Sequence, residues 1–205
     1  MKAKELLISI KPEHLVNILN GKKTLELRKT VPKHYKGWVN IYCTKSKKHF
    51  RVLSLGFYED VLYKLPNGQI KFGFPYEDEK KIFLNGKVVA RFWFGEYDTI
   101  ENEMFLLPDV ENIKQLFIEK IYEKACLTIK ELVDYSNSKT LYAWHIEELE
   151  IFDKPKELSE FYKANLYTPY EVIRAYEETT NDLISYRLQR PPQSYQFVYA
   201  KEELK

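Results

Sequence analysis

Several short stretches of the chain alternate hydrophobic and polar residues with a period of two, which predicts β-strands. In the second of these stretches, Leu25 and Leu27 are expected to face a core. Thr24, Glu26 and Arg28 then share the opposite face, so this strand presents polar side chains on one side. The predicted strands cover residues 5–10, 24–28, 37–43, 51–58, 87–94, 141–152 (long or bent) and 193–199.

Hydrophobic residues spaced three and four apart predict helices between these strands. The first begins at Pro12, a residue tolerated at the first helical position, and ends near Gly21, which suits a left-handed C-cap. A second is expected around residues 113–121. Thr128 and Glu131 have the spacing of a capping box and open a short third helix. The longest begins at Thr168-Pro169 and runs through residues 172–184.

The order of these elements predicts an α+β fold, with a small curved mixed sheet or β-barrel and helices packed around it. Strands and helices do not alternate regularly and there is no Gly-rich phosphate loop, which argues against a doubly wound sheet. Residues 59–84 contain a hairpin-type turn at 65–69 and are expected to form an excursion from the core.

A length of 205 residues favours one domain over residues 1–205. No apolar run approaches the roughly 18 residues needed to span a membrane, and no secretory leader is recognisable, so a cytoplasmic location is expected. The two cysteines, Cys43 and Cys126, are far apart in the chain and do not suggest a disulfide framework.

The formal net charge of +2 hides an uneven distribution, because residues 1–51 carry +10 and residues 52–205 carry −8. A basic segment on an acidic remainder is typical of a protein that turns one face to a polyanion such as RNA. The alternative is a solvated basic face whose charges pair with the acidic remainder.

Two stretches of this basic segment carry candidate chemistry. Lys23, Thr24, Glu26 and Arg28 bring an amine, a hydroxyl, a carboxylate and a guanidinium together, a set suited to binding a polar ring or a phosphate. The alternative is an exposed Glu26–Arg28 ion pair worth under about 1 kcal/mol. The run 45–51 includes Lys45, Lys47 and Lys48 and has aromatic neighbours that could stack on bases, although turn lysines are often only solvated.

Trp144 and His145 form a further candidate, since an indole stacks on bases and an imidazole titrates near neutral pH. A lone strand histidine is more often structural. The four histidines show no metal-ligand spacing, so neither a metal site nor a cofactor is predicted. Ser194, which follows two prolines and a glutamine, lacks the sequence context of a nucleophile.

Five segments of the chain together resemble ASCH domains of bacteriophage and bacterial proteins, which are relatives of the PUA RNA-binding fold. They are Ser9–Pro12, Ile18–Lys29, Asn85–Ala90, Tyr142–Ile146 and Arg190–Ser194. The resemblance implies a small PUA-like β-barrel with flanking helices, a cleft floored by the strand at 24–28, and two insertions, a hairpin at 59–84 and a helical one at 156–187.

The resemblance also implies that a basic cleft binds RNA or a nucleotide. Lys23, Arg28 and the lysine run would contact phosphate, Trp144 would stack on a base, and Glu26 and Gln193 would recognise base edges. The complete set of expected binding residues is Lys23, Thr24, Glu26, Arg28, Lys45, Lys47, Lys48, Trp144, Arg190, Gln193 and Ser194.

Two alternative functions follow from the same sequence. One ASCH branch hydrolyses the acetyl amide of N4-acetylcytidine with a lysine, a threonine and a glutamate, and another is reported to cleave RNA. Lys23 matches that lysine, but Glu26 stands where the branch has its threonine, so an enzyme would use Lys23 and Glu26 as its catalytic pair. In the other alternative, a phage-encoded interaction module, Tyr-rich insertions contact an unidentified host protein.

Overall fold

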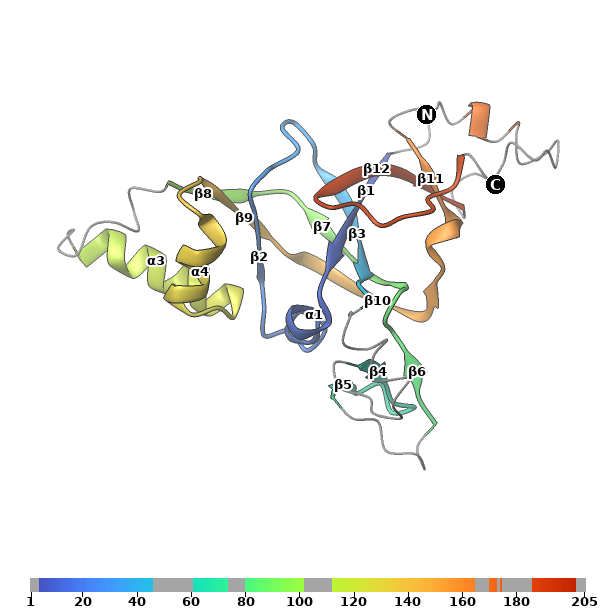
Figure 1. Ribbon diagram of the computed structural model, residues 1–205, viewed down its shortest axis with the longest axis horizontal. Helices are drawn as coiled ribbons and strands as arrows, with labels where there is room; N and C mark the ends of the chain where they lie inside the picture. Colours follow the sequence, from blue (N-terminus) through green and yellow to red (C-terminus); the bar gives the residue numbers. More distant parts are fainter. Residues whose placement is uncertain are drawn as a thin grey trace.

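The computed structural model has the predicted α+β fold, with two joined sheets, flanking helices and a separate small sheet (Figure 1). It describes residues 4–45, 61–73, 80–101, 112–164, 170–172, 174 and 186–201. The strand expected at 51–58 and most of the helix expected from residue 168 lie outside the described residues. None of the described helices is long and apolar enough to cross a membrane.

The main sheet has six strands in the order β10-β7-β3-β1-β12-β11. The pair β1 and β3 is parallel, and the other neighbouring pairs are antiparallel. β7 lies inside the sheet, which suits its β-branched and aromatic residues. The strands are β1 (Glu5–Ile10), β3 (Gly37–Cys43), β7 (Val88–Phe94), β10 (Glu147–Lys156), β11 (Phe161–Lys163) and β12 (Tyr195–Ala200).

A second sheet has three strands in the order β2-β9-β8, formed by β2 (Leu25–Arg28), β8 (Tyr97–Ile100) and β9 (Leu141–His145). The two sheets are joined by the chain, because β7 leads into β8 and β9 leads into β10 through Ile146. The bent strand predicted over 141–152 is therefore confirmed. β2 has no backbone ladder to β1 in the described part of the chain, so the two sheets do not close into a barrel.

Both faces of β2 are buried, each for a different reason. Leu25 and Leu27 pack in a core cluster with Ile121 and Ala125 of helix α3 (Asn112–Ala125). The opposite face, which carries Glu26, lies beside helices α1 (Pro12–Leu19) and α4 (Ile129–Ser136). The predicted alternation along this strand is confirmed, and it explains why a strand of only four residues separates an apolar core from a polar site.

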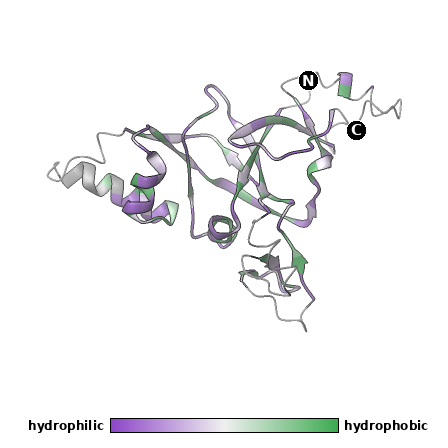
Figure 2. Ribbon diagram, viewed as in Figure 1, coloured by the Kyte–Doolittle hydropathy of each residue, from purple (hydrophilic) through white to green (hydrophobic). Residues whose placement is uncertain are grey.

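The predicted excursion contains a separate sheet in the order β5-β4-β6, whose β5 lies next to α1. Its strands are β4 (Leu62–Lys64), β5 (Ile70–Phe72) and β6 (Ile82–Phe83). Figure 2 shows hydrophobic residues in β6, and Ile82 and Phe83 are each 43% exposed.

The segment 156–187, expected to be a helical insertion, has another structure in its first part. Leu158–Glu160 form one 3-10 turn, and β11 follows it and pairs with β12 at the edge of the main sheet. Residues 161–163 thus belong to the central fold. Alternation over three residues is too short to signal a strand, which is why the sequence did not reveal it.

Candidate functional site

A pocket of about 360 Å³ opens on the polar face of β2. It lies where the end of β1, the first turn of α1 and one side of α4 meet this strand. Its described lining residues are Ser9, Ile10, Lys11, His14, Lys23, Glu26, Leu27, Arg28, Leu127, Glu131, Asp134 and Tyr135. We refer to it as the Glu26 pocket.

Three charged side chains form the floor of the Glu26 pocket. Lys23 Nζ lies 3.3 Å from Glu26 Oε2, and Arg28 Nε lies 3.1 Å from Glu26 Oε1. Lys23, Glu26 and Arg28 are only 4%, 7% and 8% exposed. Charged residues are seldom this buried unless they are paired, and here one carboxylate serves two cations. The exposed ion pair considered from the sequence is therefore replaced by a buried triad.

The surroundings of the triad fix its protonation and its position. Burial alone would raise the pKa of Glu26, but the charges of Lys23 and Arg28 outweigh burial and lower it. Glu26 is therefore ionised at neutral pH. Lys23 Nζ also donates a hydrogen bond to the carbonyl oxygen of Ala125 at 3.0 Å, which ties the strand entry to the end of α3.

Arg28 also joins the two sheets where their backbones do not pair. Its Nη2 donates to the carbonyl oxygen of Ser9 at 2.7 Å, and its Nη1 donates to that of Ser194 at 3.3 Å. The Ser194 hydroxyl lies 2.7 Å from the Thr30 hydroxyl, and Ser9 Oγ donates to the carbonyl oxygen of Pro192 at 2.8 Å. The segment before β12 is thus fastened to β1 and β2 beside the pocket.

The pocket rim carries groups that exchange protons or stack on rings. Burial, and after it the nearby charge of Lys23, lowers the pKa of His14, so its imidazole is neutral at pH 7. Burial raises the pKa of the Tyr135 phenol. Tyr135 is 41% exposed, and Lys29 Nζ lies 5.1 Å from the centroid of its ring. Hydrogen bonds donated by the Thr128 backbone and hydroxyl lower the pKa of Glu131.

The described lining is balanced in charge. Its cations are Lys11, Lys23 and Arg28, and its carboxylates are Glu26, Glu131 and Asp134. With His14 neutral, these charges cancel. The sequence predicted a basic cleft, whereas the described lining is neutral. The difference comes from the carboxylates of α4, because the sequence does not show that this helix lies beside β2.

Four of the expected binding residues lie in or directly beside the Glu26 pocket. Lys23, Glu26 and Arg28 form its floor. The carbonyl oxygen of Ser194 accepts a hydrogen bond from Arg28 and lies beside the pocket. Thr24 is exposed at the entry to β2 and is not among the residues that line the pocket. Its backbone pairs with Lys124 and Ile146 instead.

Trp144 has a structural position that does not fit the expected base-stacking role. Its indole is completely buried, with ring centroids 4.8 Å from Phe94 and 6.0 Å from Tyr195. It presents no ring face to solvent, because its ring packs in the main core cluster. An aromatic residue in a strand is more often part of the core, and here it is.

The remaining expected binding residues lie elsewhere. Lys45 lines a second cavity of about 710 Å³ together with Glu157 and Arg187. Arg190 and Gln193 are exposed, and Gln193 lines a separate hollow with Tyr195 and Gln196. Lys47 and Lys48 lie outside the described residues.

Several lining residues were not predicted from the sequence to belong to a site. Ser9 and His14 come from the opening strand and helix, and Glu131, Asp134 and Tyr135 come from α4. The capping box at Thr128 did predict α4, and both of its reciprocal bonds are present. It could not show that α4 lies over β2, because that packing depends on residues about 100 positions apart in the chain.

Comparison with solved structures identifies proteins of the same fold. The crystal structure of ASCH from Zymomonas mobilis has a TM-score of 0.51 and 19% identity, and the match covers 98% of this chain and 90% of that one. For a Tyr-to-Phe variant of the same protein, the TM-score is 0.51 and the identity 18%, and the match covers 98% of this chain and 94% of that one. For a Ser-to-Ala variant, the TM-score is 0.52 and the identity 18%, and the match covers 98% of this chain and 92% of that one. Neither protein-family models nor the sequences of curated proteins match this chain. The expected ASCH-type fold is confirmed.

Proposed function

Since this chain has the fold of the ASCH domain proteins, we propose that it binds single-stranded RNA and holds one nucleobase in the Glu26 pocket. The observation that carries this proposal is a pocket of about 360 Å³ with a polar, charge-balanced lining and exposed lysines at its edge. That volume lies in the range of small-molecule sites, roughly 300–1,000 Å³.

The lining suits a base better than a phosphate. Neutral His14 and Tyr135 each offer both a donor and an acceptor, while the Ser9 hydroxyl, which donates to Pro192, and the carboxylates of Glu131 and Asp134 offer acceptors. A dianionic phosphate would meet three carboxylates, whereas a base edge presents alternating donors and acceptors. Single-stranded RNA is recognised through bases turned out of the stack, which are read along their edges and stacked on aromatic rings. Tyr135 supplies such a ring at the rim.

Exposed lysines next to the pocket supply contacts for the phosphate backbone. Lys11 lines the pocket, Lys22 precedes Lys23, and Lys29 follows Arg28 and lies over Tyr135. Lysines of this kind bind phosphate as mobile point charges and make affinity depend on salt. The base pocket and the lysines together form one interface on β2 and α1.

The hydrolase alternative has less support from the geometry. It requires Lys23 or Glu26 to exchange a proton with the substrate. Glu26 is held ionised between two cations, and Lys23 Nζ is directed to Glu26 and to the carbonyl oxygen of Ala125. Because both groups are held by contacts within the protein, neither is free to exchange a proton with a substrate. The geometry therefore favours binding over catalysis.

Fluorescence anisotropy with a labelled, unstructured RNA oligonucleotide tests the proposal. We expect binding at low salt that weakens as salt rises, and competition by free nucleosides. Tyr135→Ala should weaken binding by about 5- to 150-fold, the equivalent of one lost base stack of roughly 1–3 kcal/mol. Lys29→Ala should weaken binding to every RNA sequence and reduce the slope of log affinity against log salt by about 0.7.

Lys154→Ala is the matched control, because Lys154 is an exposed lysine of β10 and does not line the Glu26 pocket. It should bind as the unmodified protein does. Equal losses for Lys154→Ala and Lys29→Ala would mean that charge alone causes binding, and the absence of binding at low salt would exclude the proposal. Chromatography of the same samples, incubated with RNA or N4-acetylcytidine, should show no product.

A further inference from the structure

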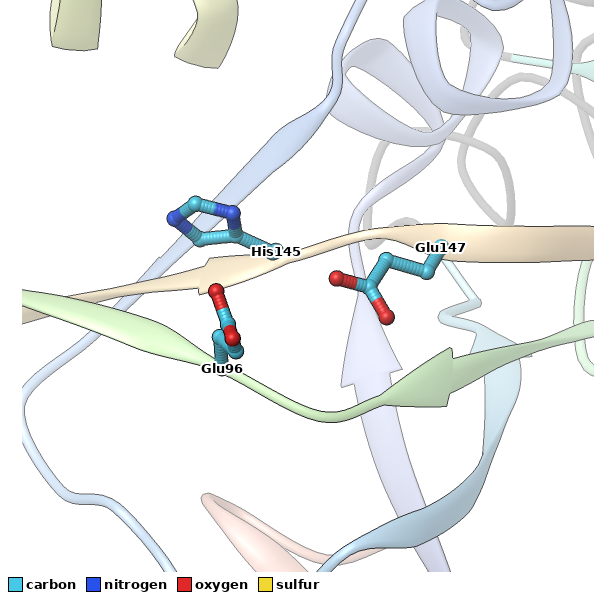
Figure 3. A group of neighbouring side chains, drawn as sticks. All are labelled: Glu96, His145 and Glu147. Atoms are coloured by element: carbon cyan, nitrogen blue, oxygen red, sulfur yellow. The ribbon is translucent and has the colours of Figure 1, made fainter.

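Outside the Glu26 pocket, three metal-ligating side chains converge where the two sheets are joined. Glu96 lies between β7 and β8, and His145 and Glu147 flank the bend between β9 and β10 (Figure 3). One ligand atom from each side chain lies within 4.8 Å of the other two. The backbone fixes this proximity, since the His145 amide donates to the carbonyl oxygen of Glu96 at 3.1 Å.

A fourth residue sets the orientation of the imidazole. His145 Nε2 lies 2.8 Å from Asp98 Oδ2. With Nε2 bonded to this carboxylate, Nδ1 is the nitrogen left to bind an ion together with Glu96 and Glu147. A histidine that ligates a metal commonly donates its other ring N–H to a carboxylate, which fixes the tautomer. The Asp98–His145 pair has this arrangement.

The charges of the cluster also favour a cation. Glu96 and Glu147 place two carboxylates side by side, and neither forms an ion pair with another residue in the described parts of the chain. The third group of the cluster is an imidazole, which ligates metal ions through a ring nitrogen.

We propose that Glu96, His145 and Glu147 bind one divalent transition-metal ion of the zinc type, with Asp98 as the positioning residue for His145. One imidazole and two carboxylates suit Zn²⁺, whereas Mg²⁺ and Ca²⁺ prefer oxygen ligands alone. Tetrahedral ligands at about 2.1 Å from Zn²⁺ lie roughly 3.4 Å from one another, so small rotations of the glutamate side chains complete the site. The ion would pin the β7–β8 connection to the β9–β10 bend.

Isothermal titration calorimetry of the full chain with ZnCl₂, after treatment with a chelator, tests this site. We expect one equivalent to bind, and MgCl₂ to bind far more weakly. His145→Ala and Glu96→Gln should each reduce Zn²⁺ affinity at least tenfold. Asp98→Asn, which leaves all three ligands in place, should reduce it by about 10- to 100-fold. Glu148→Gln is the matched control, because Glu148 is an exposed neighbour on the same strand, and it should leave the affinity unchanged.

Thermal melts without metal separate a loss of ligands from a loss of fold. The four variants should melt close to the unmodified protein, and the unmodified protein and Glu148→Gln should gain more stability on addition of Zn²⁺ than the other three variants. Absence of Zn²⁺ binding by the unmodified protein would overturn the proposal. Binding that persists unchanged in His145→Ala would also overturn it, since the ion would then bind elsewhere. An unchanged affinity in Asp98→Asn would overturn the positioning role.

Discussion

Glu26 is the residue on which the buried charges of the pocket depend. It lies between Lys23 and Arg28, at 3.3 Å from the amine and 3.1 Å from the guanidinium. Burying ions is costly, and a buried pair is tolerated only when opposite charges and hydrogen bonds replace the lost water. Removing the central carboxylate would leave two like charges facing each other with little solvent to screen them.

Glu26→Gln should therefore destabilise the protein by about 3 kcal/mol at pH 7. Urea denaturation followed by circular dichroism measures this change. Asp134→Asn is the control, because this carboxylate of the same pocket is exposed, and its effect should stay within about 0.5 kcal/mol. Equal effects of the two substitutions would show that the triad has no special role in stability.

The stability difference between Glu26→Gln and the unmodified protein should depend on pH. The pKa of Glu26 is lower in the folded protein than its ordinary value of 4.5. Its ionisation therefore stabilises the fold above about pH 4.5, and this contribution is lost as pH falls through the lowered pKa. Denaturation of both proteins between pH 7 and pH 3 should show their difference shrinking below pH 4.5. A constant difference would contradict the ionised state assigned to Glu26.

At the scale of elements, α4 forms one wall of the pocket and depends on its N-cap. Thr128 Oγ1 accepts a hydrogen bond from the Glu131 backbone, and the Glu131 side chain accepts one from the Thr128 backbone. Thr128→Ala should cost about 1 kcal/mol of stability and speed amide exchange in the first turn of α4. Hydrogen exchange with mass spectrometry measures this effect.

Lys130→Ala is the control for the cap, because it changes an exposed side chain of the same turn without altering the capping box. It should leave exchange in α4 unchanged. If Thr128→Ala also weakens RNA binding while β2 keeps its protection from exchange, α4 contributes to the interface as proposed. Unchanged exchange in Thr128→Ala would mean that packing, and not the cap, fixes the start of α4.

At the scale of the whole molecule, the seam between the two sheets is held by side chains. β2 pairs only with β9 in the described structure, and Arg28 spans the gap to Ser9 and Ser194 with a planar guanidinium. Lysine carries the same charge but cannot present donors in two fixed directions. Arg28 therefore links the β2-β9-β8 sheet to β1 and to the segment before β12, and the Thr30–Ser194 hydroxyl pair supports the second of these links.

Arg28→Lys should lower the free energy of unfolding by about 2 kcal/mol, because one or both bonds across the seam are lost. Hydrogen exchange should show faster exchange in β2, β8 and β9 than in β1, β3 and β7. Lys29→Arg, an exposed change at the next position, should alter neither stability nor exchange. Loss of protection across both sheets together would show that they open as one cooperative unit.

Periodicity located most of the elements because it reflects local geometry. The alternation at 24–28 predicted which side chains of β2 face the core, and the capping box predicted the start of α4. The short β11 gave no pattern long enough to recognise. Trp144 shows a further limit of sequence-based prediction. The sequence around a tryptophan in a strand does not tell whether its indole faces a ligand or the core, and here it faces the core.

Spacing over a few residues was enough to predict the α+β class, the buried and polar faces of β2, and Lys23, Thr24, Glu26 and Arg28 as a candidate chemical group. The carboxylates of α4 over that group, the place of Trp144 in the core, and the proximity of Glu96 and His145 are seen in the three-dimensional structure alone. Such encounters join residues far apart in the chain, and the packing of apolar faces creates them. No local pattern along the chain records that packing.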